Sequence, residues 1–91
     1  MEFGWDYKKA ITHAKKHLAT FDEAMTCFYD PHQVAFYDPD HSEDEDREIM
    51  IARSNHNRML LVCYTIRDEK IRIISARLAT KREINDYEAG I

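Results

Sequence analysis

Cysteine, proline and glycine are scarce in this sequence, which has two of each among 91 residues. The two cysteines, Cys27 and Cys63, are too few for a disulfide framework, so we expect both to be reduced and packed in the core. With 44% hydrophobic and 33% charged residues, the chain has the composition of a globular protein rather than of a disordered one. At this length we expect one small domain, residues 1–91.

Long apolar runs and motifs for nucleotide or thiol chemistry are also missing. The longest purely apolar run, Met59–Tyr64, is far too short to span a bilayer, and the first residues show no signal-peptide pattern. We therefore expect a cytoplasmic protein that does not contact a membrane. The sequence has no Gly-rich phosphate loop and no Cys-x-x-Cys pair, and it suggests no Ser-His-Asp or Cys-His arrangement.

The net charge of −4 conceals two regions of opposite sign. Residues 20–48 contain ten acidic residues and one arginine, whereas residues 49–82 contain eight lysines and arginines and two acidic residues. A basic region of this kind can bind a polyanion, because local fields matter more than the total charge. The alternative, from composition alone, is that these are ordinary solvated charges.

Apolar residues at three- and four-residue spacings predict three helices. The first, over residues 7–17, begins after Asp6, whose carboxylate can cap it. The other two, over residues 21–29 and 80–88, each begin with a Thr-x-x-Glu capping box. The helices therefore flank the middle of the chain, where strands are expected.

Alternating and β-branched segments predict the strands. A short aromatic stretch over residues 3–5 is strand-like, and the other predicted strands cover residues 34–37, 48–54, 58–67 and 70–77. The segment 58–67 is apolar on both faces, which is typical of a central strand. The order predicts an α+β domain: two N-terminal helices and a C-terminal helix packed on a three- to four-stranded antiparallel sheet.

Arginines are concentrated on the last two predicted strands. Simple alternation places Arg77 on one face of its strand with Ile71 and Ile73, and Arg72 on the other face. Arg67 ends the preceding strand. A guanidinium can bind a phosphate through two N–H groups, although an exposed arginine on a strand is also common without any function. Further cations that would extend a basic surface are Arg53, Lys81 and Arg82.

Lys16 and His17 lie at the end of the first predicted helix. Histidine titrates near neutrality and can transfer a proton, but a helix C-terminus also attracts cations for electrostatic reasons alone. His13 and His17 have the spacing of metal ligands, yet the glutamate of a zinc-protease motif is missing between them. We therefore expect no metal and no cofactor.

Several motifs occur together along the chain: Phe3-x-Trp5-Asp6, Lys9-Ala10, Lys16-His17, Phe21-x-Glu23-Ala24, Phe28-x-Asp30, Asp46-Arg47, Arg58-x-Leu60-x-Val62-x-Tyr64-Thr65-x-Arg67, Ile71-Arg72-Ile73-Ile74-Ser75-Ala76-Arg77, Ala79-x-x-x-Glu83 and Tyr87-Glu88. In these motifs the chain resembles the BrnT toxin family over nearly its whole length. The resemblance implies a fold similar to the RelE ribonucleases, cleavage of RNA and growth arrest. It also implies neutralisation by a BrnA antitoxin, whose ribbon-helix-helix part binds the operon's own DNA.

Two residues depart from the family pattern. His13 stands where the family usually has asparagine, and Leu18 stands where glycine usually follows the Lys-His pair. Glycine is the usual helix stop with a left-handed backbone, so Leu18 suggests a different exit from the first helix.

These observations lead to the hypothesis of a metal-independent endoribonuclease toxin that inhibits translation. The catalytic residues would be Lys16, His17, Arg67, Arg72 and Arg77, with the three guanidinium groups converging at one water-accessible hollow. The residues predicted to bind RNA are Arg53, Tyr64, Lys81, Arg82 and Tyr87, although either tyrosine can instead fill the core.

The expected partners are a BrnA-like antitoxin and RNA, with operator DNA contacted only through the antitoxin. The alternative is a module without catalytic activity, in which the basic sheet binds an acidic antitoxin segment and the complex represses its own operon. A DNA-binding domain acting alone is disfavoured, because no basic recognition helix is evident.

Overall fold

The computed structural model describes residues 2–38 and 46–90. For residues 15–17 it describes the helical backbone but not the side chains. The sequence also predicts a turn over residues 38–41 and an acidic loop over residues 42–46, and most of this segment, residues 39–45, lies outside the described residues. No helix in the described ranges is long and apolar enough to cross a membrane.

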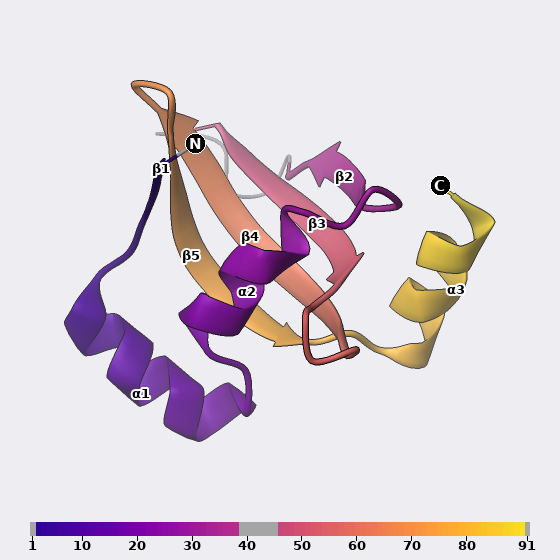
Figure 1. Ribbon diagram of the computed structural model, residues 1–91, viewed down its shortest axis with the longest axis horizontal. Helices are drawn as coiled ribbons and strands as arrows, with labels where there is room; N and C mark the ends of the chain where they lie inside the picture. Colours follow the sequence, from indigo (N-terminus) through magenta and orange to yellow (C-terminus); the bar gives the residue numbers. More distant parts are fainter. Residues whose placement is uncertain (1, 39–45, 91) are drawn as a thin grey trace.

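The described residues form one five-stranded sheet in the order β1-β5-β4-β3-β2 (Figure 1). The elements are β1 (Glu2–Gly4), α1 (Tyr7–His17), α2 (Phe21–Cys27), β2 (Val34–Tyr37), β3 (Arg47–Arg53), β4 (Met59–Arg67), β5 (Lys70–Leu78) and α3 (Lys81–Ala89). The α+β class is confirmed, and β4 is the central strand, as its apolar faces predicted.

The expected three- to four-stranded antiparallel sheet is wrong in strand number and direction. β1 adds a fifth strand and runs parallel to β5, with Glu2 opposite Lys70 and Gly4 opposite Arg72. Local turn signals identify antiparallel neighbours, whereas a parallel pair needs a long crossover connection. Here the paired residues are 68 positions apart, from Glu2 to Lys70, so no local pattern marks their pairing.

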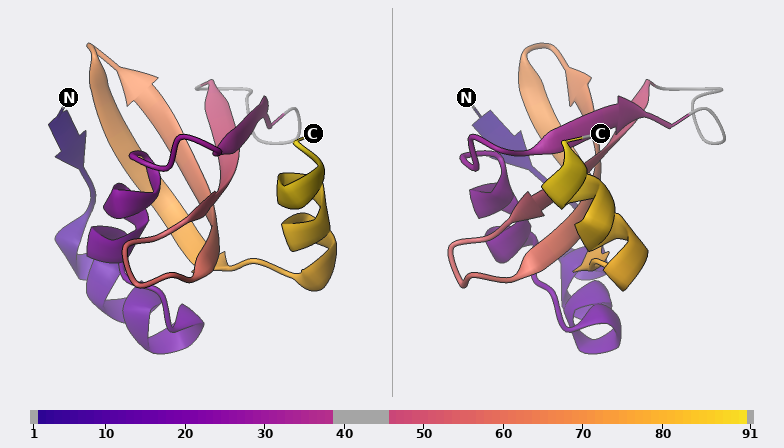
Figure 2. Two further views of the ribbon diagram at one scale, coloured as in Figure 1. Left: turned by 45° about the vertical axis from the view of Figure 1, so that its right-hand side comes forward. Right: turned by 90° about the vertical axis from the view of Figure 1, so that its right-hand side faces the viewer.

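The helices lie on both sides of the sheet. Figure 2 shows α1 and α2 on one side and α3 on the other. α1 begins where predicted, because the Asp6 carboxylate accepts hydrogen bonds from the backbone N–H groups of Lys8 and Lys9 at 3.0 and 3.2 Å. The capping box predicted at Thr80 is confirmed in full at the start of α3. At the start of α2 the Thr20 hydroxyl accepts from the Glu23 N–H as predicted, but the Glu23 carboxylate binds Ser54 and Arg58.

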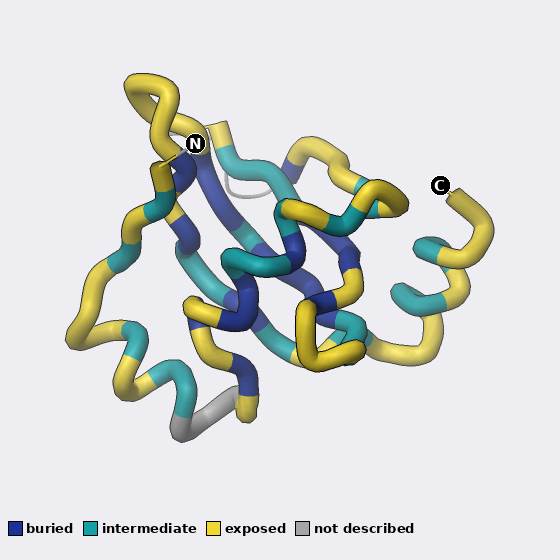
Figure 3. The backbone as a smooth tube through the Cα atoms, in the orientation of Figure 1, coloured by how far each residue is buried: buried dark blue, intermediate teal, exposed yellow. Residues whose placement is uncertain are grey.

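The core lies between α2 and the sheet (Figure 3). Phe21, Ala24 and Cys27 of α2 are buried against the strands. Burial raises the pKa of the Cys27 thiol to about 12, which keeps it protonated. Both cysteines are free, as expected, although Cys63 is only half-buried. The sheet residues of the core are Met50, Ala52, Leu60, Val62, Tyr64, Ile71, Ile73 and Ala76.

A bulge in the β4–β5 pair changes which face each residue of β5 occupies. Tyr64 is opposite Ile73 and Cys63 is opposite Ser75, so Ile74 has no partner on β4. Ile73 and Ala76 are both buried in the core, three positions apart. The predicted strict alternation along β5 is therefore wrong. The extra residue reverses the faces of the residues that follow it, so Arg77 lies on the opposite face of the sheet from Ile73.

β1 pairs only with residues 70–72 of β5, and α1 lies beside the rest of that edge. The Nε2 atom of His13 accepts a hydrogen bond from the backbone N–H of Ala76 at 3.0 Å and also contacts the Ala76 carbonyl oxygen. His13 thus occupies backbone groups that an edge strand would otherwise expose. His13, which departs from the family pattern, therefore has a structural role in this chain, because it binds the backbone of β5.

Leu18 ends α1 in the left-handed conformation, with φ 57° and ψ 17°. The expectation of a different helix exit is therefore wrong. The backbone adopts the geometry that glycine favours, and Leu18 bears the strain of a side chain in that region. The Leu18 carbonyl oxygen also accepts a hydrogen bond from Arg58 Nη2 at 2.9 Å, which fixes the end of the helix.

A buried carboxylate joins α2 to the hairpin between β3 and β4. Glu23 is only 6% exposed and accepts hydrogen bonds from Ser54 Oγ at 2.6 Å and Arg58 Nε at 3.0 Å. Arg58 Nη2 makes a further ion pair with it. The Arg58 hydrogen bond lowers the pKa of Glu23, so its charged form stabilises the fold.

Candidate active site and nucleic-acid interface

The three arginines predicted to converge are divided between the two ends of β5. Arg67 and Arg72 line one hollow of about 550 Å³ near the β4–β5 turn. Arg77 lines another, of about 510 Å³, on the side of the sheet that faces α3. Arg72 and Arg77 are five positions apart, roughly 16 Å along an extended strand. The prediction that all three guanidinium groups converge is therefore wrong, because Arg77 is too far from Arg72 along β5.

Arg77 is held in place by Glu83 of α3. Its Nη1 and Nη2 atoms each donate to a different Glu83 carboxylate oxygen at 2.8 Å, and Nη1 also donates to the Leu78 carbonyl oxygen at 3.2 Å. Glu83 Oε1 accepts a further bond from the Thr80 N–H at 2.8 Å. The Arg77 hydrogen bond lowers the pKa of Glu83, so the pair is ionised at neutral pH.

One edge of the Arg77 guanidinium is still available for a ligand. A guanidinium has five N–H donors, and the bonds to Glu83 and Leu78 use those on one side of it. Among the described residues nothing accepts from Nε, and the side chain is 41% exposed. The Nε–Nη2 edge can therefore bind two oxygens of a phosphate while Glu83 fixes the orientation of the group.

The end of α1 lies near the same part of β5. His13 lines the hollow that Arg77 lines, together with Ser75 and Cys63. Lys16 and His17 belong to the last turn of α1, and their side chains lie outside the described part of the structure. His17 is four residues after His13 on this helix.

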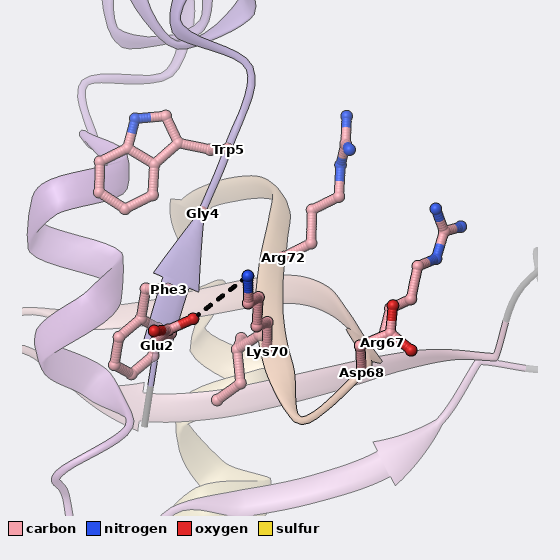
Figure 4. A pocket seen from close by; sticks show the side chains of 9 residues that line it. Glu2, Phe3, Gly4, Trp5, Arg67, Asp68, Lys70 and Arg72 are labelled. Carbon is pink, nitrogen blue, oxygen red and sulfur yellow. Dashed lines mark ion pairs between the residues drawn. The ribbon is translucent and has the colours of Figure 1, made fainter.

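Cations gather at the opposite end of the sheet, around Arg72. Arg72, Lys9 and Arg47 line a hollow of about 250 Å³ that adjoins the one shared by Arg67 and Arg72. Figure 4 shows the side chains of Arg67 and Arg72 extending to the same side of the β4–β5 hairpin, with the Trp5 ring at the border of the hollow and directed away from Arg72. Sequence reasoning missed Lys9, Arg47 and Trp5 as candidates, because they come from three elements that meet only in the folded sheet.

The residues predicted to bind RNA occupy different environments. Tyr64 is 5% exposed and packs edge-on against Phe28, with ring centroids 4.8 Å apart. Its predicted contact with a base is therefore wrong, because it fills the core. Tyr87 donates to Asp30 Oδ2 at 2.8 Å, which tethers α3, and Arg53 donates to the Asn57 side chain at 2.9 Å.

Lys81 and Arg82 are exposed in the first turn of α3. Their predicted contact with RNA stays a prediction. Within residues 2–38 and 46–90, no group of three or more His, Cys, Asp or Glu side chains is placed to hold a metal ion.

Comparison with known proteins assigns the chain to a class and then to a family. A crystal structure of the Brucella abortus ribonuclease toxin BrnT matches 89% of this chain and 99% of that one, with a TM-score of 0.63 and 23% sequence identity, which shows a shared fold. The family model for BrnT, the ribonuclease toxin of type II toxin–antitoxin systems, matches residues 5–83. The chain therefore belongs to the BrnT family. No curated protein sequence matches it.

Proposed function

We propose that this protein is a metal-independent endoribonuclease that cleaves cellular RNA and thereby inhibits translation. Its membership of a family of ribonuclease toxins supplies the class of reaction. The observation that carries the proposal is the open Nε–Nη2 edge of Arg77, held by Glu83 beside the hollow that α1 reaches. A preorganised donor of this kind stabilises the charge that develops on a phosphate during cleavage.

RNA cleavage without a metal needs a base for the 2′-hydroxyl proton, a cation for the phosphate, and an acid for the leaving 5′-oxygen. We assign the phosphate to Arg77, and the proton transfers to His17 and Lys16. The assignment is supported by the position of His17 on α1, four residues after His13. Arg67, the last residue of β4, and Arg72 of β5 line a hollow at the opposite end of β5 from Arg77, so their part in this proposal is RNA binding.

The proposed activity is tested with purified, antitoxin-free protein incubated with RNA in EDTA. Cleavage is expected, and Arg77→Ala should fold normally yet lose about 100-fold or more in kcat. Lys8→Gln, which removes an exposed positive charge that does not line the Arg77 hollow, is the matched control and should cleave at the wild-type rate. Full activity of Arg77→Ala would overturn the assignment of this residue.

Glu83 acts through Arg77 as a positioning residue. Glu83→Gln is expected to lower kcat with little change in KM, because substrate still meets a cation but one with less fixed geometry. If Glu83 serves only the stability of α3, the variant will lower the melting temperature while leaving kcat unchanged at a temperature where the protein is folded.

As a member of a type II toxin–antitoxin family, the protein has an antitoxin partner. We propose that this partner is a BrnA-like ribbon-helix-helix protein, and that the complex contacts operator DNA only through it. Intact RNA in the EDTA assay, together with tight antitoxin binding and operator repression, would instead favour the module without catalytic activity. A small ribbon-helix-helix reading frame beside this gene is expected in either case.

A further inference from the structure

Three cations from separate elements surround one hollow near the β4–β5 turn. Arg47, Thr65 and Arg72 are directly opposite one another across β3, β4 and β5, so they share a face of the sheet. Lys9 of α1 completes the lining. Thr65 between the arginines is 2% exposed and donates its hydroxyl to the Asp46 carbonyl oxygen at 2.7 Å. The two arginines therefore flank a short side chain that offers no counter-charge.

The charges around this hollow are only partly compensated. Within the described residues, the side chains of Arg72 and Lys9 make no hydrogen bond or ion pair. Asp6, which also lines the hollow, has its carboxylate engaged by the N–H groups that begin α1. Neighbouring like charges destabilise a fold, and an anionic ligand would relieve their repulsion.

An aromatic ring borders the adjoining hollow. Trp5 is half-buried and lines the 550 Å³ hollow together with Arg67 and Arg72. Tyr7 lies next to it, with ring centroids 6.0 Å apart, and is 76% exposed. Gly4 is opposite Arg72, and a Cβ there would meet no atom within 4 Å, so the hollow is open beside Gly4. The Trp5 ring also packs edge-on against Phe21, with centroids 6.2 Å apart, which fixes its position at the border of the hollow.

We propose that Trp5, Arg72 and Lys9 form a binding site for an unpaired stretch of RNA, separate from the catalytic centre. The cations bind successive phosphates, and a base stacks on the indole of Trp5. Aromatic rings combined with a basic groove are the recurring means of binding single strands, whereas an acidic protein segment gives the ring no comparable partner. The proposal rests on the proposed function for its substrate class, and it places this part of the RNA roughly 16 Å from Arg77 along β5.

The site has its own optical probe, since Trp5 is the only tryptophan of the chain. We suggest titrating the full chain with a short single-stranded DNA oligonucleotide, which lacks the 2′-hydroxyl that cleavage requires, and following tryptophan emission. Saturable quenching is expected. Arg72→Gln and Lys9→Gln should each weaken binding about tenfold and reduce the salt dependence by about 0.7 in the logarithmic slope. Lys8→Gln, the same charge change one residue away, should bind like the wild type.

Each outcome separates this inference from the proposed function. Equal quenching by a duplex of the same sequence would overturn the preference for unpaired strands. Equal quenching by polyglutamate would show a site for an acidic protein instead. A protein that cleaves RNA while Arg72→Gln and Lys9→Gln bind like the wild type overturns this inference alone. A protein that binds the oligonucleotide as described but leaves RNA intact overturns the proposed activity alone.

Discussion

The two ends of β5 contain arginines in opposite situations. At the β4–β5 turn, Arg72 makes no ion pair with the described residues and lies beside Lys9 and Arg47. At the other end, Arg77 is fixed by two bonds of 2.8 Å to Glu83. A free cation contributes affinity and tolerates movement, whereas a fixed one contributes the geometry that a transition state requires. In the two proposals above, β5 serves RNA binding at one end and cleavage at the other.

Replacing the arginine at each end of β5 tests this division between binding and cleavage most directly. Arg77→Lys keeps the charge but loses the planar pair of donors, so kcat should fall about 100-fold with a small change in KM. Arg72→Gln should instead raise KM, because it weakens binding before the chemical step. Steady-state cleavage kinetics measure both. The comparison fails if the two variants change the same parameter.

The stability of the domain is expected to depend on the buried carboxylate of Glu23, at the same end of the sheet as Arg77. Glu23→Gln removes the charge that Arg58 and Ser54 bind, and it should lower the free energy of unfolding by about 2 kcal/mol. Urea denaturation measures the change. Glu2→Gln, which removes the exposed partner of Lys70 at the opposite end, is the control and should have little effect.

Acid should weaken the same end of the molecule. The pKa values of Glu23 and Glu83 are lowered from 4.5 by the hydrogen bonds of Arg58 and Arg77, respectively. Their contribution to stability is therefore complete above pH 4.5 and is lost as the pH falls through the lower folded-state pKa values. Melting temperatures measured between pH 7 and pH 3 should fall less steeply in Glu23→Gln than in the wild type. Parallel curves would contradict this link.

The smallest expected effect is on the stability of the C-terminal end of α1, at Leu18. Leu18 is 72% exposed and has φ 57°, so its side chain contributes strain and little burial. Leu18→Gly should therefore raise the free energy of unfolding by about 1 kcal/mol. Thermal denaturation at neutral pH measures the gain. Leu78→Gly is a suitable contrast, because Leu78 is exposed on a strand, where glycine should destabilise.

Local signals in the sequence predicted most of the elements. The carboxylate of Asp6 and the Thr-x-x-Glu boxes marked the helix starts, and the apolar segment 58–67 marked the central strand. The parallel pairing of β1 and the bulge at Ile74 could not be predicted, because both depend on partners distant in the sequence. These two features decide where Arg72 and Arg77 lie.

The sequence predicted several residues of the candidate site but not how they are arranged. Arg72 and Arg77 were identified from their place on a strand, yet Glu83, which fixes Arg77, was recognised only as part of a capping box. Tyr64 was misassigned because an amphipathic ring in a central strand can face either way. Lys9 and Trp5 line the two adjoining hollows around Arg72 only because α1 and β1 lie along the edge of β5.

α3 is attached by polar contacts more than by apolar burial. None of its residues, 81–89, all of which are described, is fully buried. The ion pair of Glu83 with Arg77 and the hydrogen bond from Tyr87 to Asp30 attach it to the rest of the domain. Elements with little buried apolar surface open locally at low energetic cost. Amide hydrogen exchange should consequently be faster in α3 than in β4. Each such opening would break the bonds between Glu83 and the guanidinium of Arg77. The proposed active site would therefore keep its geometry only while α3 stays packed on the sheet.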